Sequence, residues 1–298
     1  MGDWREMTRE CLVDIMTRLP LEDRWRWSPL VCRSWLAASR DPSLWRTLDL
    51  EPCFLSGGPE EQPRWWTPEF EAAIDAMLLS VIQWSSGGLK EVLLRHCSDR
   101  SLLVLVERSP ELRALSIKSS PNVTDLSISK MAASCPMLAE LDISFCYNVS
   151  HESLKLIGHN CRNLKVLRRN LLNWLDPSQH RGIIPAEYLN SVPQNGDEEA
   201  AVIAKFMPNL VHLDLRFSKL SPNGLKLIVE GCTKLEILDL FGCANLTSRA
   251  LQDAAEGLKN LKVFTRPNFY IPRSVFHTER YGHWRLYDER FQTNVFQI

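Results

Sequence analysis

Five cysteines recur at similar places along the 298-residue chain, and their thiols are the side chains that could bind a soft metal ion. They are Cys135, Cys146, Cys161, Cys232 and Cys243. A structural zinc site uses thiolates in close C-x-x-C pairs, whereas the spacing of these cysteines follows an internal repeat. We therefore expect buried thiols and no metal site. The odd total of nine cysteines, without a secretory signal, also argues against a disulfide framework.

Histidines and asparagines offer two further kinds of chemistry. The seven histidines show no metal-binding spacing and no pairing with a nucleophile in a known pattern. The sequence thus predicts no catalytic residue and no cofactor. Three N-x-[ST] triplets could accept glycans, but they recur with the same repeat, so we expect their Ser or Thr to cap helices. These triplets begin at Asn122, Asn148 and Asn245.

The repeat that positions these residues is marked by leucines. Their successive separations are 23, 26, 26, 46, 25 and 26 residues, and the outlier is one repeat plus an insertion of about 20 residues. After each leucine, apolar residues stand at the fourth and sixth positions and often Cys at the ninth, as in Leu138–Leu141–Ile143–Cys146. The marking leucines are Leu89, Leu112, Leu138, Leu164, Leu210, Leu235 and Leu261.

Each repeat reads as a short strand, a capped turn and a helix. The L-x-L alternation predicts a strand with one buried face, and Ser221-Pro222 is a typical helix start. This order, at a period of about 26 residues, indicates leucine-rich repeats of the cysteine-containing form. The fold class is an α/β solenoid, with six units plus a closing half-unit near Leu261–Phe264 and a parallel sheet on the concave side.

The first fifty residues do not follow the leucine repeat. Apolar spacing predicts three helices, over Thr8–Leu19, Leu21–Trp27 and Leu30–Ala38. Five of the ten tryptophans lie within residues 4–45. So much apolar surface on a small helical unit either meets a partner or packs against the end of the solenoid.

Here the residues resemble the F-box motif in order and spacing, although Met7-Thr8 stands where that motif commonly has Leu-Pro. With the repeats, the chain resembles plant F-box/leucine-rich-repeat proteins of the Skp-interacting-partner type. Further segments that resemble this group are Trp65–Phe70, Asn122–Asp125 and Leu167–Leu171. The segments that carry the F-box resemblance are Leu12–Ile15, Leu19–Asp23, Leu30–Trp35 and Asp41–Trp45.

This resemblance implies a substrate receptor of an SCF (cullin–RING) ubiquitin ligase. The F-box would dock on the Skp adaptor, and through it on a cullin, while the repeats hold a protein substrate and catalysis belongs to the associated enzyme. A leucine-rich-repeat scaffold without ligase function is the alternative. The adaptor-binding residues that we predict are Leu12, Ile15, Leu19, Pro20 and Trp35.

The expected organisation has four parts. The F-box covers residues 4–50, a linker and degenerate capping repeat 51–88, the repeats 89–265 and an aromatic-rich tail 266–298. Between Leu50 and Pro68 we expect a loop, and with Trp45–Leu50 as a strand and Thr67–Trp84 as a helix, a first degenerate repeat. The insertion near 173–197 is either a binding loop or a tolerated surface loop.

Outward-facing strand positions predict where a protein substrate would bind. Arg168 should lie between Asp142 and Asp214 and offset their charges, and this ladder could simply stabilise the sheet. Arg169 takes an apolar core position, which suggests that its strand is distorted by the insertion. The residues that we expect to be free for substrate are Arg95, Lys118, Arg216 and Phe241. If they form only a solvated rim, the insertion or the tail would hold the partner.

Charge and hydropathy limit the remaining classes of partner. The net charge of −1 gives no overall field for nucleic acid or an anionic membrane. The segment Ala72–Trp84 is too short to cross a bilayer and is interrupted by Asp75. We therefore expect a soluble protein of the nucleus, the cytoplasm or both, without nucleic-acid or membrane binding.

Overall fold

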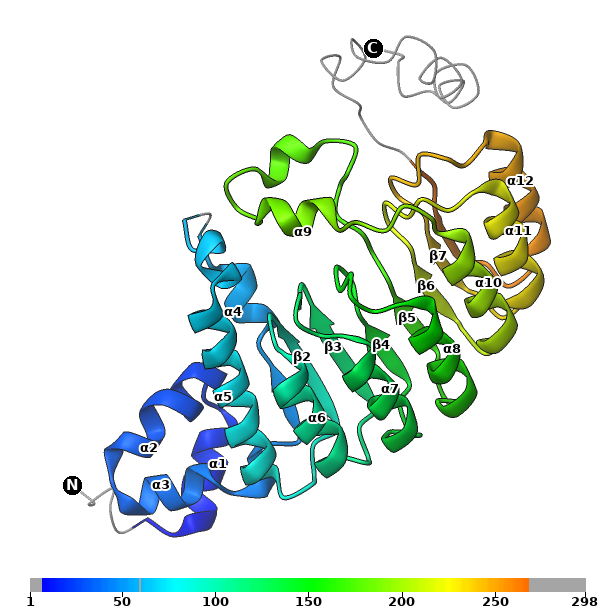
Figure 1. Cartoon of the computed structure of the whole chain (residues 1–298). Helices are drawn as coiled ribbons and strands as arrows, with labels where there is room; N and C mark the ends of the chain where they lie inside the picture. Colours follow the sequence, from blue (N-terminus) through cyan, green and yellow to red (C-terminus); the bar gives the residue numbers. More distant parts are fainter. Residues whose placement is uncertain (1–6, 59, 268–298) are drawn as a thin grey trace.

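The computed structural model describes residues 7–58 and 60–267, and it forms one elongated, curved solenoid with a small helical unit at its amino-terminal end (Figure 1). One parallel sheet of eight strands runs through the molecule in sequence order. The strands are β1 (Thr47–Asp49), β2 (Glu91–Arg95), β3 (Ala114–Lys118), β4 (Glu140–Asp142), β5 (Val166–Arg168), β6 (His212–Asp214), β7 (Ile237–Asp239) and β8 (Val263–Thr265).

A row of helices covers the convex face, one after each strand from β1 to β7 (Figure 1). The predicted solenoid is confirmed: β2 to β7 head the six units, and β8 is the closing half-unit. Strand β1 and the first helix of the row form the degenerate first repeat, since β1 pairs with β2 in parallel. The helices are α5 (Pro68–Ser85), α6 (Asp99–Arg108), α7 (Asp125–Ser134), α8 (His151–Asn160), α10 (Asp197–Phe206), α11 (Pro222–Gly231) and α12 (Ser248–Gly257).

The repeated leucines form a continuous core between the sheet and the helices. Six of the seven marking leucines are buried, and Leu261 is half-buried at the open end of the stack. The inward strand leucines, such as Leu141, Leu213 and Leu238, are fully buried. Because one unit cannot bury both of its faces, stacking of neighbours makes this core.

Side-chain caps start the convex helices as the repeat predicts. Thr124 accepts a hydrogen bond from the Leu126 amide and Ser150 from the Glu152 amide, both at 3.2 Å. Each of these capping residues is held in turn by a carboxylate of the preceding helix. Asp125 accepts from the Ser150 amide at 2.8 Å, and Asp99 accepts from the Thr124 hydroxyl at 2.6 Å. This cap ladder therefore joins successive repeats as well as starting their helices.

A left-handed residue follows several strands at the eighth position of the repeat. Its φ is between 53° and 74° in the residues concerned, which turns the chain sharply away from the strand. Gly242 has no room for a side chain, because an added Cβ would lie 2.3 Å from the Phe217 ring. The residues with this conformation are His96, Ser119, Phe145, Phe217 and Gly242.

The amino-terminal unit has three helical segments, α1 (Arg9–Thr17), a second helix formed by η1 (Asp23–Trp27) and α2 (Ser28–Val31), and α3 (Arg33–Ser39), followed by η2 (Pro42–Leu44). The predicted start of the third helix at Leu30 is wrong. Leu30 and Val31 end the second helix, and Cys32 is extended with φ −164°, which separates it from α3.

Two segments expected to be irregular contain short helices. In the linker, α4 (Glu51–Ser56) and η3 (Gln62–Trp66) each carry a proline in the first two positions, where proline suits a helix start. In the insertion, η4 (Pro177–His180) and α9 (Ala186–Asn190) fold into a lobe. Both α4 and α9 lie at the edge where the strands end (Figure 1). Across the described ranges no helix has the length and apolarity to span a bilayer, and residues 268–298 of the predicted tail lie outside the description.

Candidate functional site

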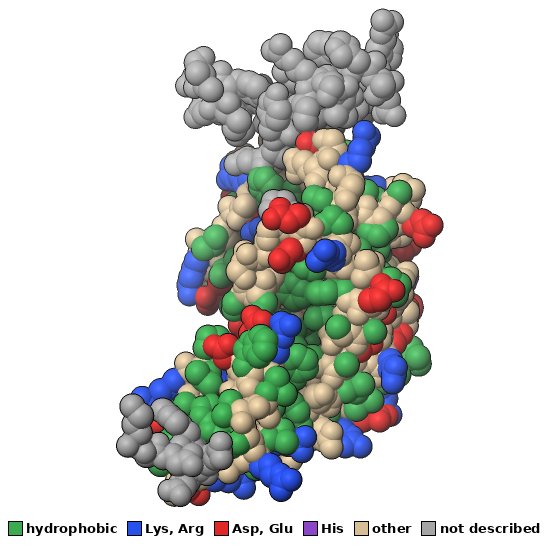
Figure 2. Space-filling view, turned by 90° about the vertical axis from the view of Figure 1, so that its left-hand side faces the viewer, with side chains coloured by type: hydrophobic (Ala, Val, Ile, Leu, Met, Phe, Trp, Pro, Cys, Tyr) green, Lys and Arg blue, Asp and Glu red, His purple; other side chains and the backbone are tan. Residues whose placement is uncertain are grey.

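The amino-terminal unit presents an apolar surface at its outer end. Trp27, Leu30 and Val31 expose 51%, 75% and 58% of their surface, and hydrophobic side chains gather on this end of the molecule (Figure 2). We call these three residues the F-box patch. They occupy the end of the second helix, where Leu30 and Val31 follow Trp27 by three and four positions, about one helical turn.

The predicted adaptor residues lie at different depths. Pro20 is exposed, while Ile15, Leu19 and Trp35 are half-buried. Leu12 is 1% exposed and belongs to the core of the unit, because it faces inward with Met16 along α1. Leu12 therefore supports the surface from beneath and is not part of it, which corrects our expectation of a contact residue.

Buried hydrogen bonds hold the unit rigid and join it to the solenoid. The Arg24 guanidinium donates to the carbonyls of Met16, Leu19 and Leu44 at 3.0–3.1 Å, and burial lowers its pKa. The Trp45 indole donates to the Ser39 carbonyl at 2.7 Å, and its ring lies 5.3 Å from that of Trp84 on α5. Trp25 and Trp35 also pack against the core, so part of the tryptophan surface is covered within the molecule.

On the concave face, Arg95 and Lys118 are engaged within the molecule. Both bind the carboxylate of Glu51 on α4, Arg95 at 2.8 Å and 3.1 Å and Lys118 at 3.2 Å. Burial opposes ionisation of Glu51, but the hydrogen bond from Arg95 and the charge of Lys118 keep its pKa below the usual value. The Arg95 guanidinium also lies over the Phe54 ring, 5.1 Å from its centroid. These two cations therefore tie the linker to the sheet, contrary to the expectation that they are free.

The charge ladder on the sheet is formed with different partners from those expected. The predicted register is confirmed, since Arg168 pairs with Asp142 on one side and Asp214 on the other. The Arg168 Nε reaches Asp214 at 3.3 Å. Asp142 instead pairs with Lys118 at 3.6 Å. The expectation that one arginine offsets both carboxylates is thus half correct.

Arg216 and Phe241, the other two predicted substrate residues, lie together at the opposite end of the concave face. They line a cavity of 510 Å³ between the strand ends and the insertion, which we call the distal pocket. The rings of Phe217 and Phe241 meet edge to face at 5.5 Å, and Arg216 pairs with Asp239 at 2.7 Å. The pocket lining includes Phe145, Asp176, His180, Arg216, Phe217 and Phe241.

The insertion forms a fixed wall of this pocket. The Trp174 indole donates to the Phe217 carbonyl at 2.6 Å, and Lys219 donates to Gln194 at 2.5 Å. Tyr188 stacks on Tyr147 at 4.7 Å between ring centroids and lies at the same distance from Trp66 of the linker. These contacts place the insertion against three separate parts of the chain.

The buried side chain of Arg169 joins the repeats that lie before and after the insertion. Its side chain is 1% exposed and donates to the carbonyls of Cys146 and Val149 at 2.6 Å and 2.7 Å. It also pairs with Glu199 at 3.0 Å. Burial opposes its charge, but Glu199 raises its pKa above the usual value. The expected distortion is absent from β5, which keeps the same three-residue parallel register as β4 and β6.

The five repeat cysteines are buried, as predicted, and the asparagines of the N-x-[ST] triplets also bind neighbouring parts of the stack. Cys146 and Cys243 donate to backbone carbonyls of the preceding repeat at 3.0 Å, and burial raises the pKa of Cys146 to about 12. The Asn148 amide donates to the Pro121 carbonyl at 2.7 Å. Among the residues in the description, no group of three or more His, Cys, Asp and Glu side chains is placed to bind a metal ion.

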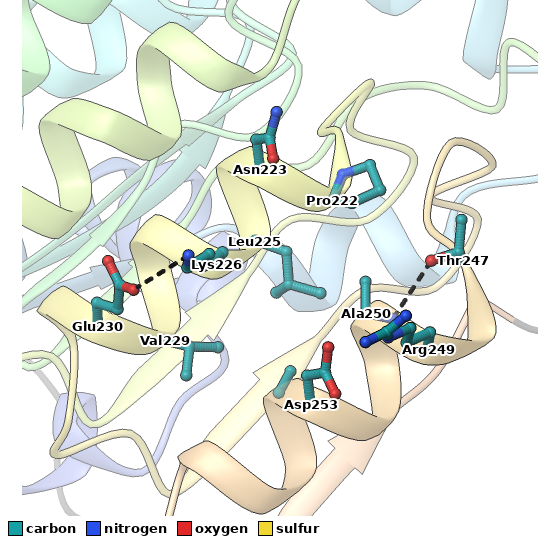
Figure 3. Close-up of a pocket in the computed structure, with 11 residues that line it drawn as sticks. Pro222, Asn223, Leu225, Lys226, Val229, Glu230, Thr247, Arg249, Ala250 and Asp253 are labelled. Carbon is teal, nitrogen blue, oxygen red and sulfur yellow. Dashed lines mark hydrogen bonds and ion pairs between the residues drawn. The ribbon is translucent and has the colours of Figure 1, made fainter.

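A further cavity of 360 Å³ lies on the convex face between α11 and α12. Figure 3 shows Lys226 reaching Glu230 on α11, at 3.9 Å, with Asp253 on the neighbouring helix. It is a groove between adjacent helices, and its apolar lining includes Leu225, Val229 and Ala254. No predicted site residue contributes to it.

Comparison with known proteins identifies the class of molecule. The family model described as F-box-like matches residues 9–51. The chain is 50% identical to the F-box protein SKIP1 of Arabidopsis thaliana, over 100% of this chain and 98% of that protein. The chain belongs to the F-box/LRR-repeat family. Another F-box/LRR-repeat relative, putative protein 19 of Arabidopsis thaliana, is 47% identical over 95% of this chain and 93% of its own length.

Among solved structures, the leucine-rich repeat-containing protein LegL7 of Legionella pneumophila is similar, at 12% identity over 85% of each chain and a TM-score of 0.40. The predicted F-box/LRR-repeat membership is confirmed by the relatives. Three features of the structure could not be read from the sequence: the exposure of Trp27, the Glu51 cluster and the position of His180 in the distal pocket. The motif residues Leu30 and Val31 were a signal for the first, but the other two depend on contacts between distant segments.

Proposed function

We propose that this F-box/LRR-repeat protein is the substrate-receiving subunit of an SCF ubiquitin ligase. Its F-box binds a Skp adaptor, and through it a cullin, while the repeats hold a protein substrate. The observation that carries the proposal is the F-box patch, Trp27, Leu30 and Val31, exposed within the segment that matches the F-box-like family. Three adjacent large apolar side chains in water favour a partner that covers them.

The proposed division of labour leaves ubiquitin transfer to the associated enzyme. This chain would position a substrate, and the rigid contacts of Trp45 and Glu51 would hold the two binding surfaces at a fixed separation. The resemblance to plant proteins of the Skp-interacting-partner type also implies that this chain binds a Skp adaptor. We further propose that the protein acts in the nucleus, the cytoplasm or both, which a fluorescent fusion in plant cells would test.

A pair of leucine variants tests adaptor binding. Leu30→Ala removes the most exposed side chain of the F-box patch, and we expect it to weaken capture of a purified Skp adaptor at least tenfold, since apolar anchors dominate many interfaces. Leu126→Ala is the matched control, because Leu126 is 64% exposed on the convex helix α7. Affinity is measured by titration of immobilised adaptor.

The result can contradict the proposal in two ways. Equal capture of both variants would remove the F-box patch from the interface. Failure of the unaltered chain to bind any Skp adaptor would favour the alternative, a leucine-rich-repeat scaffold that works without a ligase. Circular dichroism of each variant shows whether the solenoid remains folded.

A further inference from the structure

The distal pocket contains a buried polar atom that no described residue satisfies. The Nε2 atom of His180 is buried and has no hydrogen-bond partner within residues 7–58 and 60–267. His180 lines the distal pocket and also the adjoining 480 Å³ cavity beneath the insertion lobe. Buried polar atoms in native proteins are generally paired, so this nitrogen points to a ligand that supplies the partner.

The other polar side chains of the pocket already have partners. The Asn170 amide donates to Ser144 at 3.0 Å and accepts from the Arg216 backbone at 2.8 Å. Asp176 accepts from Ser178 and from Gln179, the latter at 2.9 Å. The unsatisfied group is therefore specific to His180 and not a general feature of the lining.

The protonation of His180 determines what kind of group it can recognise. Burial lowers its pKa, and a hydrogen bond with the Asn173 backbone engages the ring while Nε2 is left unpaired. A neutral imidazole whose Nδ1 donates to a carbonyl carries a lone pair on Nε2. Nε2 is then an acceptor, and the complementary ligand group is an O–H or N–H donor.

The apolar walls of the pocket are aromatic and aliphatic. Phe145, Phe217 and Phe241 line it together with Leu171 and Leu172. Phe217 and Phe241 meet edge to face, an arrangement to which a further ring can add favourably. The volume of 510 Å³ falls within the range of about 300–1,000 Å³ usual for ligand sites. The pocket also opens beside Arg216, which is 52% exposed on the concave face where a partner chain can lie.

We propose that the distal pocket binds an aromatic side chain that carries a hydrogen-bond donor, tyrosine or tryptophan, presented by a protein partner. The ring packs among the phenylalanines, and its O–H or N–H donates to His180 Nε2. The inference deepens the proposed function, on which it rests for the statement that this partner is a substrate. Arg216, held by the buried Asp239, is exposed at the mouth and placed to contact the flanking peptide.

Three capped amino acids test the pocket on the isolated full-length chain. N-acetyl-tyrosinamide and N-acetyl-tryptophanamide should bind with dissociation constants of roughly 0.1–1 mM, measured by an NMR titration that follows the signals of the probe and so serves the variants as well. N-acetyl-phenylalaninamide has the ring without the donor. We expect it to bind about 2–10 times more weakly than the tyrosine probe, the contribution of one hydrogen bond.

Two variants separate recognition from folding. His180→Phe removes the acceptor and keeps an aromatic ring, so the tyrosine and phenylalanine probes should then bind equally. Phe241→Ala should weaken all three probes, and Leu227→Ala, on the exposed face of α11, should change none of them. Loss of the tyrosine preference in His180→Phe is a result that a merely structural role would not give.

Four outcomes would overturn the proposal. The first is absence of binding at 10 mM. The second is equal affinity of the tyrosine and phenylalanine probes for the unaltered chain. The third is binding mapped to the convex groove between α11 and α12. The fourth is binding only to a full-length variant with Tyr281, Trp284 and Tyr287 changed to Ala, which would make the carboxy-terminal segment of this chain the occupant. Adaptor capture is measured separately, so a chain that binds the probes without binding a Skp adaptor would refute the proposed function and leave this pocket standing.

Discussion

At the scale of single residues, His96 shows how a repeat position can become part of a cluster. It occupies the left-handed position after β2, where Phe145 and Phe217 stand in other repeats. Its ring lies 4.8 Å from that of Trp66 and 5.9 Å from that of Phe70. Burial, helped by the nearby charge of Arg95, lowers its pKa to about 3.

This burial predicts an acid-sensitive contribution to stability. The folded pKa of His96 is below its unfolded value, so the unfolded chain binds a proton first, and stability falls as pH drops below about 6.5 towards 3. At pH 5 this residue lowers the free energy of unfolding by about 2 kcal/mol. Between pH 8 and pH 5, the free energy of unfolding of His96→Phe should therefore fall by about 2 kcal/mol less than that of the parent chain, as measured by urea denaturation.

Phenylalanine is a suitable replacement because two equivalent positions already hold it with φ of 65° and 56°. His159→Phe provides the comparison, since its ring packs against Phe206 on the convex side. Equal pH dependence of the parent chain and His96→Phe would show that His96 is accessible to protons in the folded state.

At the scale of elements, the cap ladder is what makes neighbouring repeats cooperate. Asp125 lies in the first turn of α7 and binds both the backbone and Ser153 of the next unit, at 2.8 Å and 2.5 Å. Burial opposes ionisation of Asp125, but these hydrogen bonds keep its pKa below the usual value. Carboxylates at helix starts also interact favourably with the helix dipole.

We expect Asp125→Ala to destabilise the protein by about 1–3 kcal/mol, because it leaves the Ser150 amide and the Ser153 hydroxyl without their acceptor. Asp253→Ala is the control, since Asp253 is an exposed aspartate on another convex helix, α12. Urea denaturation gives both values. If Asp125→Ala loses no more stability than Asp253→Ala, the helix caps form without the cap ladder.

At the scale of the whole molecule, Tyr188 joins three segments that are far apart in sequence. It packs between Tyr147 of the repeats and Trp66 of the linker, while its hydroxyl is buried without a partner in the described part of the chain. Tyr188→Phe removes only that hydroxyl and should stabilise the protein by about 1 kcal/mol. Tyr188→Ala should cost about 3–5 kcal/mol, the usual loss for a buried aromatic side chain.

Thermal unfolding of the two variants measures both effects, which have opposite signs. A loss of stability in Tyr188→Phe would mean that the hydroxyl has a partner after all. If Tyr188→Ala unfolds in two steps, the insertion lobe and the solenoid are separate cooperative units. A single transition would show that the lobe is part of the common structure.

The sequence could predict the features that repeat and missed those that occur once. Leucine spacing, capping Ser or Thr and buried Cys are local patterns copied several times, so each copy supports the others. Glu51 reaches Arg95 across 44 residues and Arg169 reaches Glu199 across 30. The periodicity of the sequence does not predict such pairs, because the two residues meet only in the folded chain. The same reason explains why Arg95 and Lys118 looked free, and why His180 was not recognised.

The strand order has a consequence for how far apart the two proposed binding surfaces stand. The F-box is fixed to β1 and the distal pocket lies by β5 to β7, with every strand in sequence order between them. Neighbouring strands are about 4.8 Å apart. The distance from the proposed adaptor surface to the distal pocket is therefore set by the number of strands between them. A family member that gained or lost one unit between β2 and β4 would move the pocket relative to the F-box by one step of about 5 Å, with both surfaces intact.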